Sequence, residues 1–541
     1  MSSGLLILST ILSSISATLI TSSINESPYS IELRSVAGTQ TPILGVAPKG
    51  CHVKLRRGAH ALPKHLALRS VLGLDQDHIG RREEAEPVAT VRLTGQSYIA
   101  DVTVGDQEIP LLVDTGSADL WVAPATFVCL DENHNETSKE ACNIPVYFEG
   151  TFSGGVAEDQ YFSTSYDNGQ YVYGEYGYES VTLGGITVPK QQIALASTGH
   201  FRAISGDYSG IMGLAFPAMT AARSGGNPQE TVDNEEDAAS YDPWFTSAVK
   251  QNLTEPIFSL ALDIDGGGVF ALGGAADVPI KGDFVSTPIV TFNLNKEDHS
   301  DAELTYYAFM TEDYIIAGKR LSDHSQWNTT DDDDDDDNAP DETSPGQNHH
   351  RRHPDIYPVI VDSGYPINIL PPSLIKVLYS AFPTPPELVE IQDDGAVLFA
   401  APCDTEVPSF GIQIGGHVFE QSPGDLLIAS ANVTVNGTAF CALGSQPGIE
   451  EAGALGVAFL SSVVAVFDIG ASEMRFAQRD GDALGAGIAG GSSDHGNGTV
   501  GDGQGSIGGS STGNMPAPPA TSGVANTNAG GRLLPLWGFR F

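Results

Sequence analysis

Residues 112–117 read LVDTGS, and residues 360–365 read IVDSGY. In both stretches two apolar residues lead into an aspartate, which is followed by a hydroxyl residue and a glycine. This pattern predicts an aspartate on a tight turn at the end of an apolar strand, because glycine permits the turn and leaves room beside the carboxylate. We expect the hydroxyl groups of Thr115 and Ser363 to form hydrogen bonds where the two copies meet.

Each copy is followed by a second shared pattern. Residues 210–214 read GIMGL, and residues 453–457 read GALGV. The aspartate precedes the second glycine of this pattern by 99 residues in the first copy and by 94 in the second. A single Asp-Thr-Gly is usually only a turn, but two copies with matching partners indicate one lobe present twice. Two equivalent lobes would bring Asp114 and Asp362 face to face.

The region around these motifs has the pattern of an all-β protein. From residue 88 to residue 477, short β-rich runs are separated by Gly, Pro and Asn, which favours strands joined by turns. The best candidates for helices are residues 243–252 and 372–382. In the first we expect Asp242 to be the N-cap and Pro243 to occupy the first helical position.

The charge of the chain is unevenly distributed. The 541 residues contain 26 Lys and Arg against 68 Asp and Glu, a formal charge of -42, which excludes a basic protein that coats nucleic acid. The first 82 residues carry +5 and the remainder -47. The basic stretch 24–82 ends in Arg81 and Arg82, which predicts a cationic pro-segment with a dibasic processing site. An N-terminal linker is the alternative.

The two ends of the chain predict secretion. Residues 1–23 contain an apolar stretch with the length of a signal-peptide core, although a buried helix is the alternative. No stretch predicts a transmembrane helix.

Residues 479–541 are rich in Gly and Ser and predict a flexible stalk. The stalk ends in a short apolar run, so a glycolipid anchor stays an open alternative to a free extracellular or wall-bound end. Six sequons fit secretion, unless they are unmodified surface asparagines: Asn135, Asn252, Asn328, Asn432, Asn436 and Asn497.

Four stretches together resemble one family. They are residues 114–122 (DTGSADLWV), 209–217 (SGIMGLAFP), 361–364 (VDSG) and 455–470 (LGVAFLSSVVAVFDIG). They resemble the pepsin-like aspartic proteases, over residues 88–478, and the leader and tail are like those of secreted or wall-associated fungal members. The resemblance implies an all-β, bilobal fold with the active-site cleft between two pseudo-symmetric lobes, here residues 83–275 and 276–478.

The resemblance also implies the chemistry. Asp114 and Asp362 would share a proton, because two adjacent carboxylates cannot both ionise comfortably, and would activate a water for peptide hydrolysis at acidic pH. No metal, cofactor or covalent intermediate is expected. We expect protein or peptide substrates, the pro-segment as an inhibitor, no nucleic-acid partner, membrane attachment only through a lipid on the tail, and a monomer.

Further residues are assigned by position in the family pattern. Those expected at the substrate site or the flap above it are Gly116, Gly364, Thr115, Ser363, Trp121 and Tyr166. Tyr166 would cover the cleft and hydrogen-bond Trp121; the alternative is an ordinary hairpin tyrosine. The family pattern also pairs the cysteines as Cys129–Cys142 and Cys403–Cys441, which leaves Cys51 in the pro-segment.

Three departures from the family pattern affect the expected activity. Tyr365, which is followed by Pro366, stands where the family usually has Ser or Thr, Val457 replaces a frequent Asp, and residues 167–168 change the flap tip. An active enzyme is favoured because both aspartates are present. The alternative is a catalytically impaired homologue that binds peptides at the surface; a structural wall protein would rest on the tail alone.

The second lobe carries an insertion at residues 322–354. It contains seven consecutive aspartates at 331–337 and the sequence HHRRH at 349–353. An acidic run usually forms a solvated loop, and calcium binding is only weakly indicated because the aspartates lack an ordered ligand spacing. Arg351 and Arg352 form a second candidate processing site.

Overall fold

The computed structural model describes most of the predicted body of the protein. The described residues are 98–166, 169–203, 207–225, 238–263, 267–293, 304–323, 357–390, 397–435, 437–450 and 452–480, together with two strands of the leader. The predicted signal peptide, the Arg81–Arg82 site, Cys51, most of the acidic insertion and the Gly-rich tail lie outside these ranges. Residues up to Asp480 form one compact unit, to which the description below is confined.

The first lobe is a continuous arrangement of strands. They are β3 (Tyr98–Val104), β4 (Gln107–Asp114), β5 (Leu120–Val122), β6 (Val128–Cys129), β7 (Val156–Ser165), β8 (Tyr171–Leu183), β9 (Ile186–His200), β10 (Gly210–Gly213) and β11 (Ala222–Ser224). Their order in the sheet is β11-β7-β8-β9-β5-β10-β4-β3. Side chains along β8 alternate between buried and partly exposed, which is why this stretch forms a strand with one face on the core.

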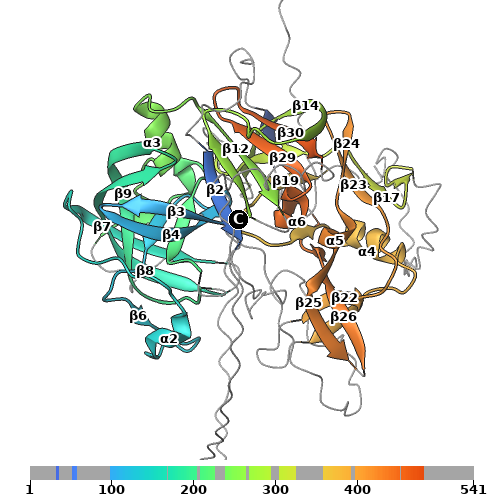
Figure 1. The fold of residues 1–541 in the computed structure, drawn as a ribbon, viewed down its shortest axis with the longest axis horizontal. Coiled ribbons are helices and arrows are strands. Elements are labelled where there is room, and N and C mark those ends of the chain that lie inside the picture. Colours follow the sequence, from blue (N-terminus) through green and yellow to red (C-terminus); the bar gives the residue numbers. More distant parts are fainter. Residues whose placement is uncertain are drawn as a thin grey trace, which may run out of the picture. The chain divides into compact units, whose positions relative to one another are not determined.

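The second lobe is built from smaller sheets. One contains β16 (Ala308–Met310), β19 (Pro358–Val361), β28 (Gly453–Leu455), β20 (Asn368–Leu370) and β27 (Ser445–Pro447). A second contains β17 (Asp313–Ile316), β18 (Lys319–Arg320), β23 (Phe410–Ile414) and β24 (His417–Glu420), and a third contains β21 (Glu387–Glu390), β22 (Val397–Pro402), β25 (Leu427–Val435) and β26 (Thr438–Leu443). Figure 1 shows the strands of the two lobes on opposite sides of a central group.

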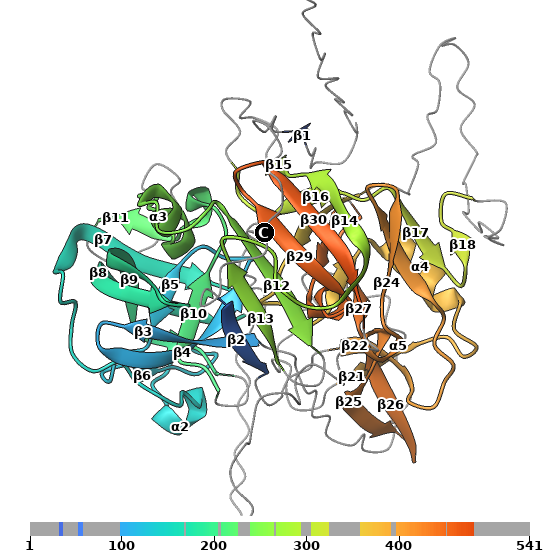
Figure 2. The ribbon, with the colours of Figure 1, turned by 45° about the horizontal axis from the view of Figure 1, so that its top comes forward.

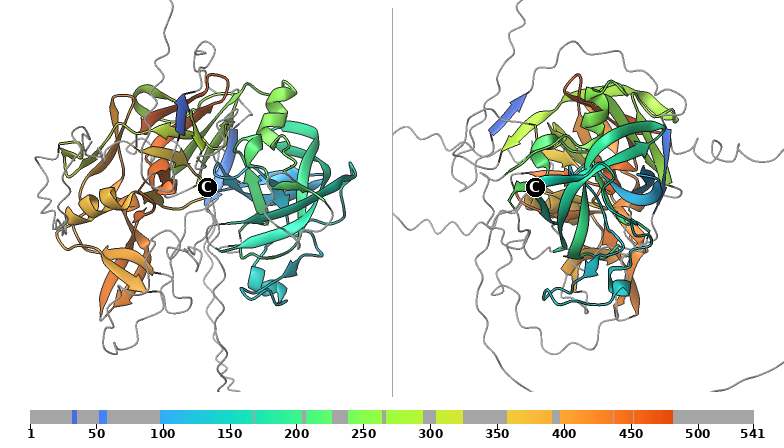
Figure 3. Two further views of the ribbon diagram at one scale, coloured as in Figure 1. Left: turned by 180° about the vertical axis from the view of Figure 1, so that it is seen from behind. Right: turned by 90° about the vertical axis from the view of Figure 1, so that its left-hand side faces the viewer.

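The central group joins the lobes. It consists of β12 (Ile257–Asp263), β13 (Gly267–Leu272), β29 (Val463–Asp468), β30 (Glu473–Arg479) and β14 (Ile280–Pro288). Phe258 of β12 and Phe467 of β29 stack with ring centroids 4.4 Å apart, and Tyr307 meets both rings edge-on. The view from behind in Figure 3 shows the same arrangement of lobes and centre. The chain is therefore an all-β, bilobal protein, as the sequence predicts.

Two strands of the basic leader pair with the body. β1 (Glu32–Ser35) is antiparallel to β15 (Val290–Asn293). β2 (His52–Arg57) lies between β3 of the first lobe and β13 of the centre, antiparallel to both. Figure 2 shows β2 beside β13. A segment of the predicted pro-segment thus occupies a position in the sheet that connects the lobe to the centre.

Both predicted helices are present, but the start of the first was wrong. α3 (Trp244–Lys250) begins one residue later than predicted, with Pro243 at the N-cap and without a side-chain cap. The Asp242 carboxylate instead contacts the Lys250 ammonium at 2.6 Å, which is why it does not cap the helix. α4 (Pro372–Ser380) agrees with the second prediction.

The other helical segments are short, namely α2 (Lys139–Cys142), η2 (Pro217–Met219), α5 (Pro423–Leu426) and α6 (Val457–Leu460). Within the described ranges, none of the helices has the length and apolar character needed to cross a membrane.

Candidate active site

Asp114 ends a strand whose neighbour is the second motif of the first lobe. β4 and β10 run parallel, with Leu112 opposite Ile211 and Asp114 opposite Gly213. The Leu214 N–H donates to the Asp114 carbonyl at 2.8 Å. The apolar residues before the aspartate are buried, so burial of the strand fixes where the carboxylate lies.

Asp362 is placed by the same device in the second lobe. β19 and β28 run parallel, with Val359 opposite Gly453 and Val361 opposite Leu455. The Asp362 N–H donates to the Leu455 carbonyl at 3.0 Å. The motifs that repeat in the sequence therefore pair with each other in the same way in both lobes, which is the duplication predicted from their spacing.

The two aspartate turns are joined through their hydroxyl residues. The Thr115 Oγ1 accepts from the Ser363 N–H at 2.9 Å, and the Ser363 Oγ accepts from the Thr115 N–H at 3.1 Å. Each hydroxyl then donates to the other lobe, Thr115 to the Val361 carbonyl at 2.8 Å and Ser363 to the Val113 carbonyl at 2.9 Å. Both residues are at most 1% exposed, so these bonds form out of water.

The two glycines leave space for the carboxyl group of the opposite lobe. A Cβ atom on Gly364 would lie 2.5 Å from the Asp114 Oδ1, and one on Gly116 would collide with the Asp362 carboxyl group. Each carboxyl group therefore lies against the glycine of the other turn. The fold brings Asp114 and Asp362 together, and it does so at a point where any side chain larger than hydrogen would push them apart.

Each carboxylate is held by its own turn. The Gly116 N–H donates to the Asp114 Oδ1 at 2.8 Å, and the Gly364 N–H donates to the Asp362 Oδ1 at 2.9 Å. The Ser117 hydroxyl also donates to the Asp114 Oδ2, at 2.5 Å. Asp114 is only 7% exposed, so the Gly116 amide and the Ser117 hydroxyl replace water as its donors.

The equivalence between the turns ends at the next residue. Tyr365 occupies the position in the second turn that Ser117 occupies in the first. Its carbonyl accepts from the Val457 N–H at 2.8 Å, so its backbone is tied to the first residue of α6, at the end of the second motif. The site is thus symmetric in its backbone and asymmetric in its side chains.

Tyr166 lies at the end of the β7–β8 hairpin, which is the predicted flap. Its phenol oxygen accepts a hydrogen bond from the Trp121 indole N–H at 2.7 Å. Burial raises the pKa of the Tyr166 phenol well above its ordinary value, and the carboxylates of Asp114 and Asp119 raise it further. The phenol therefore stays protonated and keeps an O–H to donate. The flap-tip residues 167–168 lie outside the described residues.

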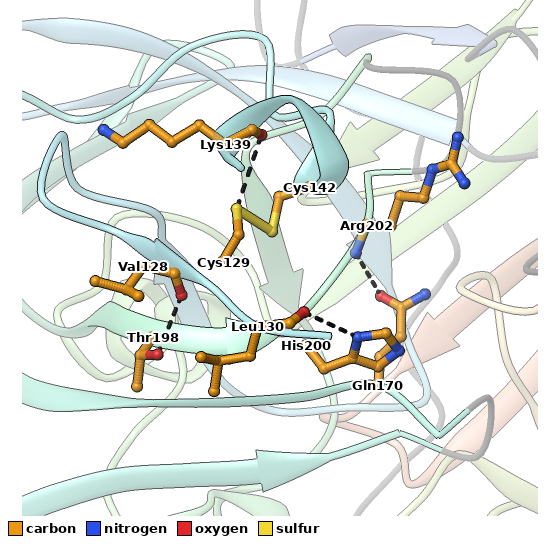
Figure 4. The surroundings of a disulfide bond; sticks show 9 residues. All are labelled: Val128, Cys129, Leu130, Lys139, Cys142, Gln170, Thr198, His200 and Arg202. Carbon is orange, nitrogen blue, oxygen red and sulfur yellow. Dashed lines mark hydrogen bonds between the residues drawn. A yellow bond between two sulfur atoms is a disulfide. The ribbon is translucent and has the colours of Figure 1, made fainter. Parts of the chain in front are cut away.

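Both predicted disulfides are present. Cys129 bonds to Cys142 and Cys403 bonds to Cys441. The first closes a loop at the edge of the first lobe, whose neighbour Leu130 accepts a hydrogen bond from the His200 ring at 3.1 Å (Figure 4). The same view shows the Arg202 N–H donating to Gln170 next to the flap turn, at 3.1 Å.

Sequence reasoning missed one buried acid beside the site. Asp119 lies five residues after Asp114, is 6% exposed, and accepts hydrogen bonds from Tyr176 and Tyr241. Its signal in the sequence was an aspartate inside the otherwise apolar end of residues 114–122. In the part of the chain that the structure describes, no group of three or more His, Cys, Asp or Glu residues is arranged to hold a metal ion.

With this geometry in view, comparison with known proteins defines the class. The family model for eukaryotic aspartyl proteases matches residues 97–331 and 346–479, so the chain belongs to this family and is an aspartic-type endopeptidase by family. It is 28% identical to a probable aspartic-type endopeptidase of Aspergillus fumigatus over 393 residues, which cover 71% of this chain and 79% of the relative.

Two other fungal proteins that are similar to this chain are pepsins by name. Aspergillopepsin-1 of Aspergillus pseudoglaucus is 25% identical over 394 residues, covering 71% of this chain and 78% of the relative. Penicillopepsin-1 of Penicillium janthinellum is 23% identical over 389 residues, covering 71% of this chain and 95% of the relative. The region matched by the family model is the bilobal body, without the leader and the tail.

Proposed function

We propose that the protein is a secreted endopeptidase that hydrolyses peptide bonds of proteins at acidic pH with a water activated by Asp114 and Asp362. The observation that carries the proposal is the seating of each carboxyl group against the glycine of the opposite turn. Two carboxyl groups brought together in this way favour a state with one shared proton, which belongs to the pair rather than to either residue.

The reaction follows from that shared proton. The ionised carboxylate takes a proton from water as the water oxygen bonds to the carbonyl carbon, and the protonated carboxyl donates to the carbonyl oxygen. The tetrahedral intermediate collapses when the carbon–nitrogen bond breaks and the amine leaves with a proton from the dyad. Acidic pH is favoured because a fully ionised dyad lacks the proton that the carbonyl needs.

Mutation of the dyad tests this mechanism. We expect Asp114→Asn and Asp362→Asn each to lower kcat/KM on a denatured protein at acidic pH by about a hundredfold or more, since general acid–base catalysis contributes roughly 10²–10⁴. Asp425→Asn is a matched control, because Asp425 is also a buried carboxyl (2% exposed) but lies in α5. Full proteolysis by either dyad variant would contradict the proposal, and pepstatin-type inhibition of the unmodified enzyme would support it.

The basic leader is proposed to keep the enzyme latent. Residues 24–82 carry the basic charge, the body is acidic, and β2 of the leader lies in the sheet between β3 and β13. Protonation of carboxylates in acid would weaken the attraction between leader and body. The variant Arg81→Ala/Arg82→Ala should keep its leader and should not cleave an added protein substrate. The dibasic control Arg351→Ala/Arg352→Ala should lose its leader normally, and an active full-length Arg81→Ala/Arg82→Ala protein would refute the inhibition.

Secretion and attachment rest on the sequence of the two ends. Residues 1–23 supply the candidate signal peptide, and Asn135 and Asn252 are exposed sequon asparagines. The intact mass of the protein recovered from culture medium, before and after removal of N-glycans, measures the termini, the glycans and any cut in the insertion. Release from cells by a phosphatidylinositol-specific phospholipase would show the lipid anchor, and a free protein in the medium would exclude it.

One feature favours a second candidate function. Tyr365 replaces the small hydroxyl residue that would match Ser117, so the second carboxylate has a different side chain beside it. The alternative is a catalytically impaired homologue that binds peptides. Binding of a pepstatin-type inhibitor with no cleavage at any pH, followed by gain of cleavage in Tyr365→Thr, would favour this alternative.

A further inference from the structure

The Asp119 carboxylate connects the catalytic turn to three other segments of the first lobe. Its Oδ1 accepts hydrogen bonds from the Tyr176 hydroxyl at 2.7 Å and from the Tyr241 hydroxyl at 3.0 Å. Its Oδ2 accepts from the Ala221 N–H at 2.9 Å. The partners lie 57, 122 and 102 residues away in sequence, so the carboxylate holds together segments that the chain itself does not join.

These segments are the base of the flap. Tyr176 belongs to β8, which is one strand of the flap hairpin. Ala221 immediately precedes β11, and β11 pairs with β7, the other strand of the hairpin, with Ala222 opposite Phe162. Figure 2 shows β11, β7 and β8 next to one another. Asp119 therefore contacts β8 of the hairpin directly, and it is linked to β7 through the pairing of β11 with β7.

The third partner, Tyr241, belongs to a segment that contacts residues 220–222. The Tyr241 N–H donates to the Thr220 hydroxyl at 3.3 Å, and the Ala239 N–H donates to the Ala222 carbonyl at 2.9 Å. The Tyr241 ring meets the Tyr176 ring edge-on at 5.4 Å, so the two phenols that donate to Asp119 also pack on each other. The segment around residue 241 is thus fixed to β11 through the same carboxylate.

Asp119 directly precedes β5, the strand whose Trp121 hydrogen-bonds the flap tyrosine. Its carbonyl accepts from the Gly213 N–H at 2.9 Å, beside the pairing of Asp114 with Gly213. Trp121, two residues later in β5, donates to the Tyr166 hydroxyl. A short stretch of chain therefore carries the catalytic carboxylate, the anchor of the flap base and the anchor of the flap tyrosine.

We propose that Asp119 is a positioning residue, which in its ionised form holds the base of the flap hairpin in place relative to the catalytic turn. It acts through Tyr176, Tyr241 and the Ala221 N–H, and it does not touch the reacting atoms. The inference deepens the proposed function, because it concerns the same site and assumes that the flap binds substrate over the dyad.

Ionisation matters because all three contacts use the carboxylate as an acceptor. Among the described residues, the titratable or charged groups that act on Asp119 or feel its charge are Tyr176 of β8, Tyr241, Arg223 of β11, and Tyr166 of the flap. Burial raises the pKa of Asp119 above its ordinary value of 3.8, against the opposing effects of the three hydrogen bonds and of the Arg223 charge. The carboxyl group therefore takes up its proton at a higher pH than an ordinary aspartate does, and protonation removes an acceptor site from the contacts.

Two of the three segments contribute phenol donors, and these stay protonated. Burial, and then the Asp119 charge, raise the pKa values of Tyr176 and Tyr241 well above the ordinary value of 10.0. Of these three groups, the carboxyl group is consequently the one that gains a proton as the pH falls. A neutral isostere should reproduce the protonated enzyme.

The test compares the enzyme with Asp119→Asn over a range of acidic pH. We expect the variant to have about tenfold lower kcat/KM at the upper end of the active range, mainly through a higher KM, on the scale of one lost charge-assisted hydrogen bond. The ratio of unmodified to variant activity should fall toward one as the pH decreases through the pKa of Asp119. Asp425→Asn, the buried carboxyl in α5, should give a ratio that does not change with pH.

A second pair of variants decides the matter if Asp119→Asn does not fold. Tyr241→Phe and Tyr176→Phe each remove one donor and keep the carboxylate, and both should raise KM with kcat less affected. A ratio independent of pH for Asp119→Asn, or an unchanged KM in both phenylalanine variants, would overturn the inference. An unmodified enzyme without acid proteolysis would instead refute the proposed function, so the two failures are distinct.

Discussion

Thr115 and Ser363 lie 248 residues apart in the sequence and exchange hydrogen bonds between hydroxyl and backbone N–H, at 2.9 and 3.1 Å. Each of these two residues directly follows one of the two aspartates in the sequence. The exchange of hydrogen bonds makes the position of each aspartate dependent on the other lobe. The first prediction tests this dependence.

Replacing either hydroxyl should destabilise the protein. Thr115→Ala or Ser363→Ala leaves a buried N–H without its acceptor, which costs about 1–3 kcal/mol in the free energy of unfolding. The double variant should lose less than the sum of the two single losses, because the residues form one network. Denaturant unfolding measures the losses. Ser380→Ala, which removes an exposed hydroxyl bonded to the Val377 carbonyl, should change stability by less than about 0.5 kcal/mol.

A methyl group on the second active-site glycine should strongly lower the activity. In Gly364→Ala the new Cβ would lie 2.5 Å from the Asp114 Oδ1, so one carboxyl must move. We expect kcat to fall by about a hundredfold or more, because displacement of catalytic groups by an ångström has an effect of this size. Gly424→Ala is the matched control, since its Cβ would have only the Ser422 Oγ near it, at 3.8 Å. Equal activities of the two variants would show that the glycine is not needed for space.

Removal of the flap hydroxyl should weaken substrate turnover. Tyr166→Phe deprives the buried Trp121 N–H of its acceptor, so the flap tyrosine loses its fixed position. We expect kcat/KM to fall about tenfold, the scale of a single lost hydrogen bond to a buried donor. Tyr173→Phe, on β8 of the same hairpin, is the comparison and should stay close to the unmodified enzyme. Steady-state kinetics on one peptide substrate distinguishes the two.

The two disulfides should contribute unequally to stability. Cys403–Cys441 spans 38 residues and Cys129–Cys142 spans 13. In the chain-entropy model, removing the longer link as Cys403→Ala/Cys441→Ala should cost about 1 kcal/mol more than removing the shorter one. Unfolding of the two double variants side by side measures this difference. The opposite order would mean that native-state contacts outweigh loop entropy.

Asp119 should also give the stability a characteristic dependence on pH. Because the folded pKa is raised above 3.8, the folded state binds the proton more tightly than the unfolded state. Its contribution to stability is therefore largest in acid and is lost as the pH rises from about 3.8 through the folded pKa. The unfolding free energy of the unmodified protein should decrease relative to that of Asp119→Asn over this interval. A difference that is constant with pH would contradict the direction of the shift.

The duplicated aspartate turns could be predicted because their signal is local and occurs twice. Each turn needs a short apolar strand, one carboxylate and one glycine, and these are adjacent in sequence. The duplication of one lobe was predicted from the same motifs, whereas the bilobal fold with its cleft was predicted from the resemblance to the family. The partner of Trp121 was found through resemblance to the family rather than through any physical pattern.

Asp119 and the start of α3 show where prediction from the sequence stops. The donors to Asp119 are at least 57 residues away, so no local pattern reveals that the carboxylate is buried and shared. Asp242 was expected to cap the helix, but the competing contact with Lys250 comes from the far end of the same helix. In both cases the partner of a charged side chain depends on which groups the folded chain brings near it.

Each active-site glycine makes room for the aspartate of the other lobe, and this limits how the sequences of the two lobes can diverge. Gly116 is required by Asp362 and Gly364 by Asp114, so a substitution in one half is felt first in the other. The side chains one position further on are free of this constraint, and there the halves differ, with Ser117 in one and Tyr365 in the other. The two copies are therefore bound to a common backbone at the dyad while each can acquire its own chemistry one residue away.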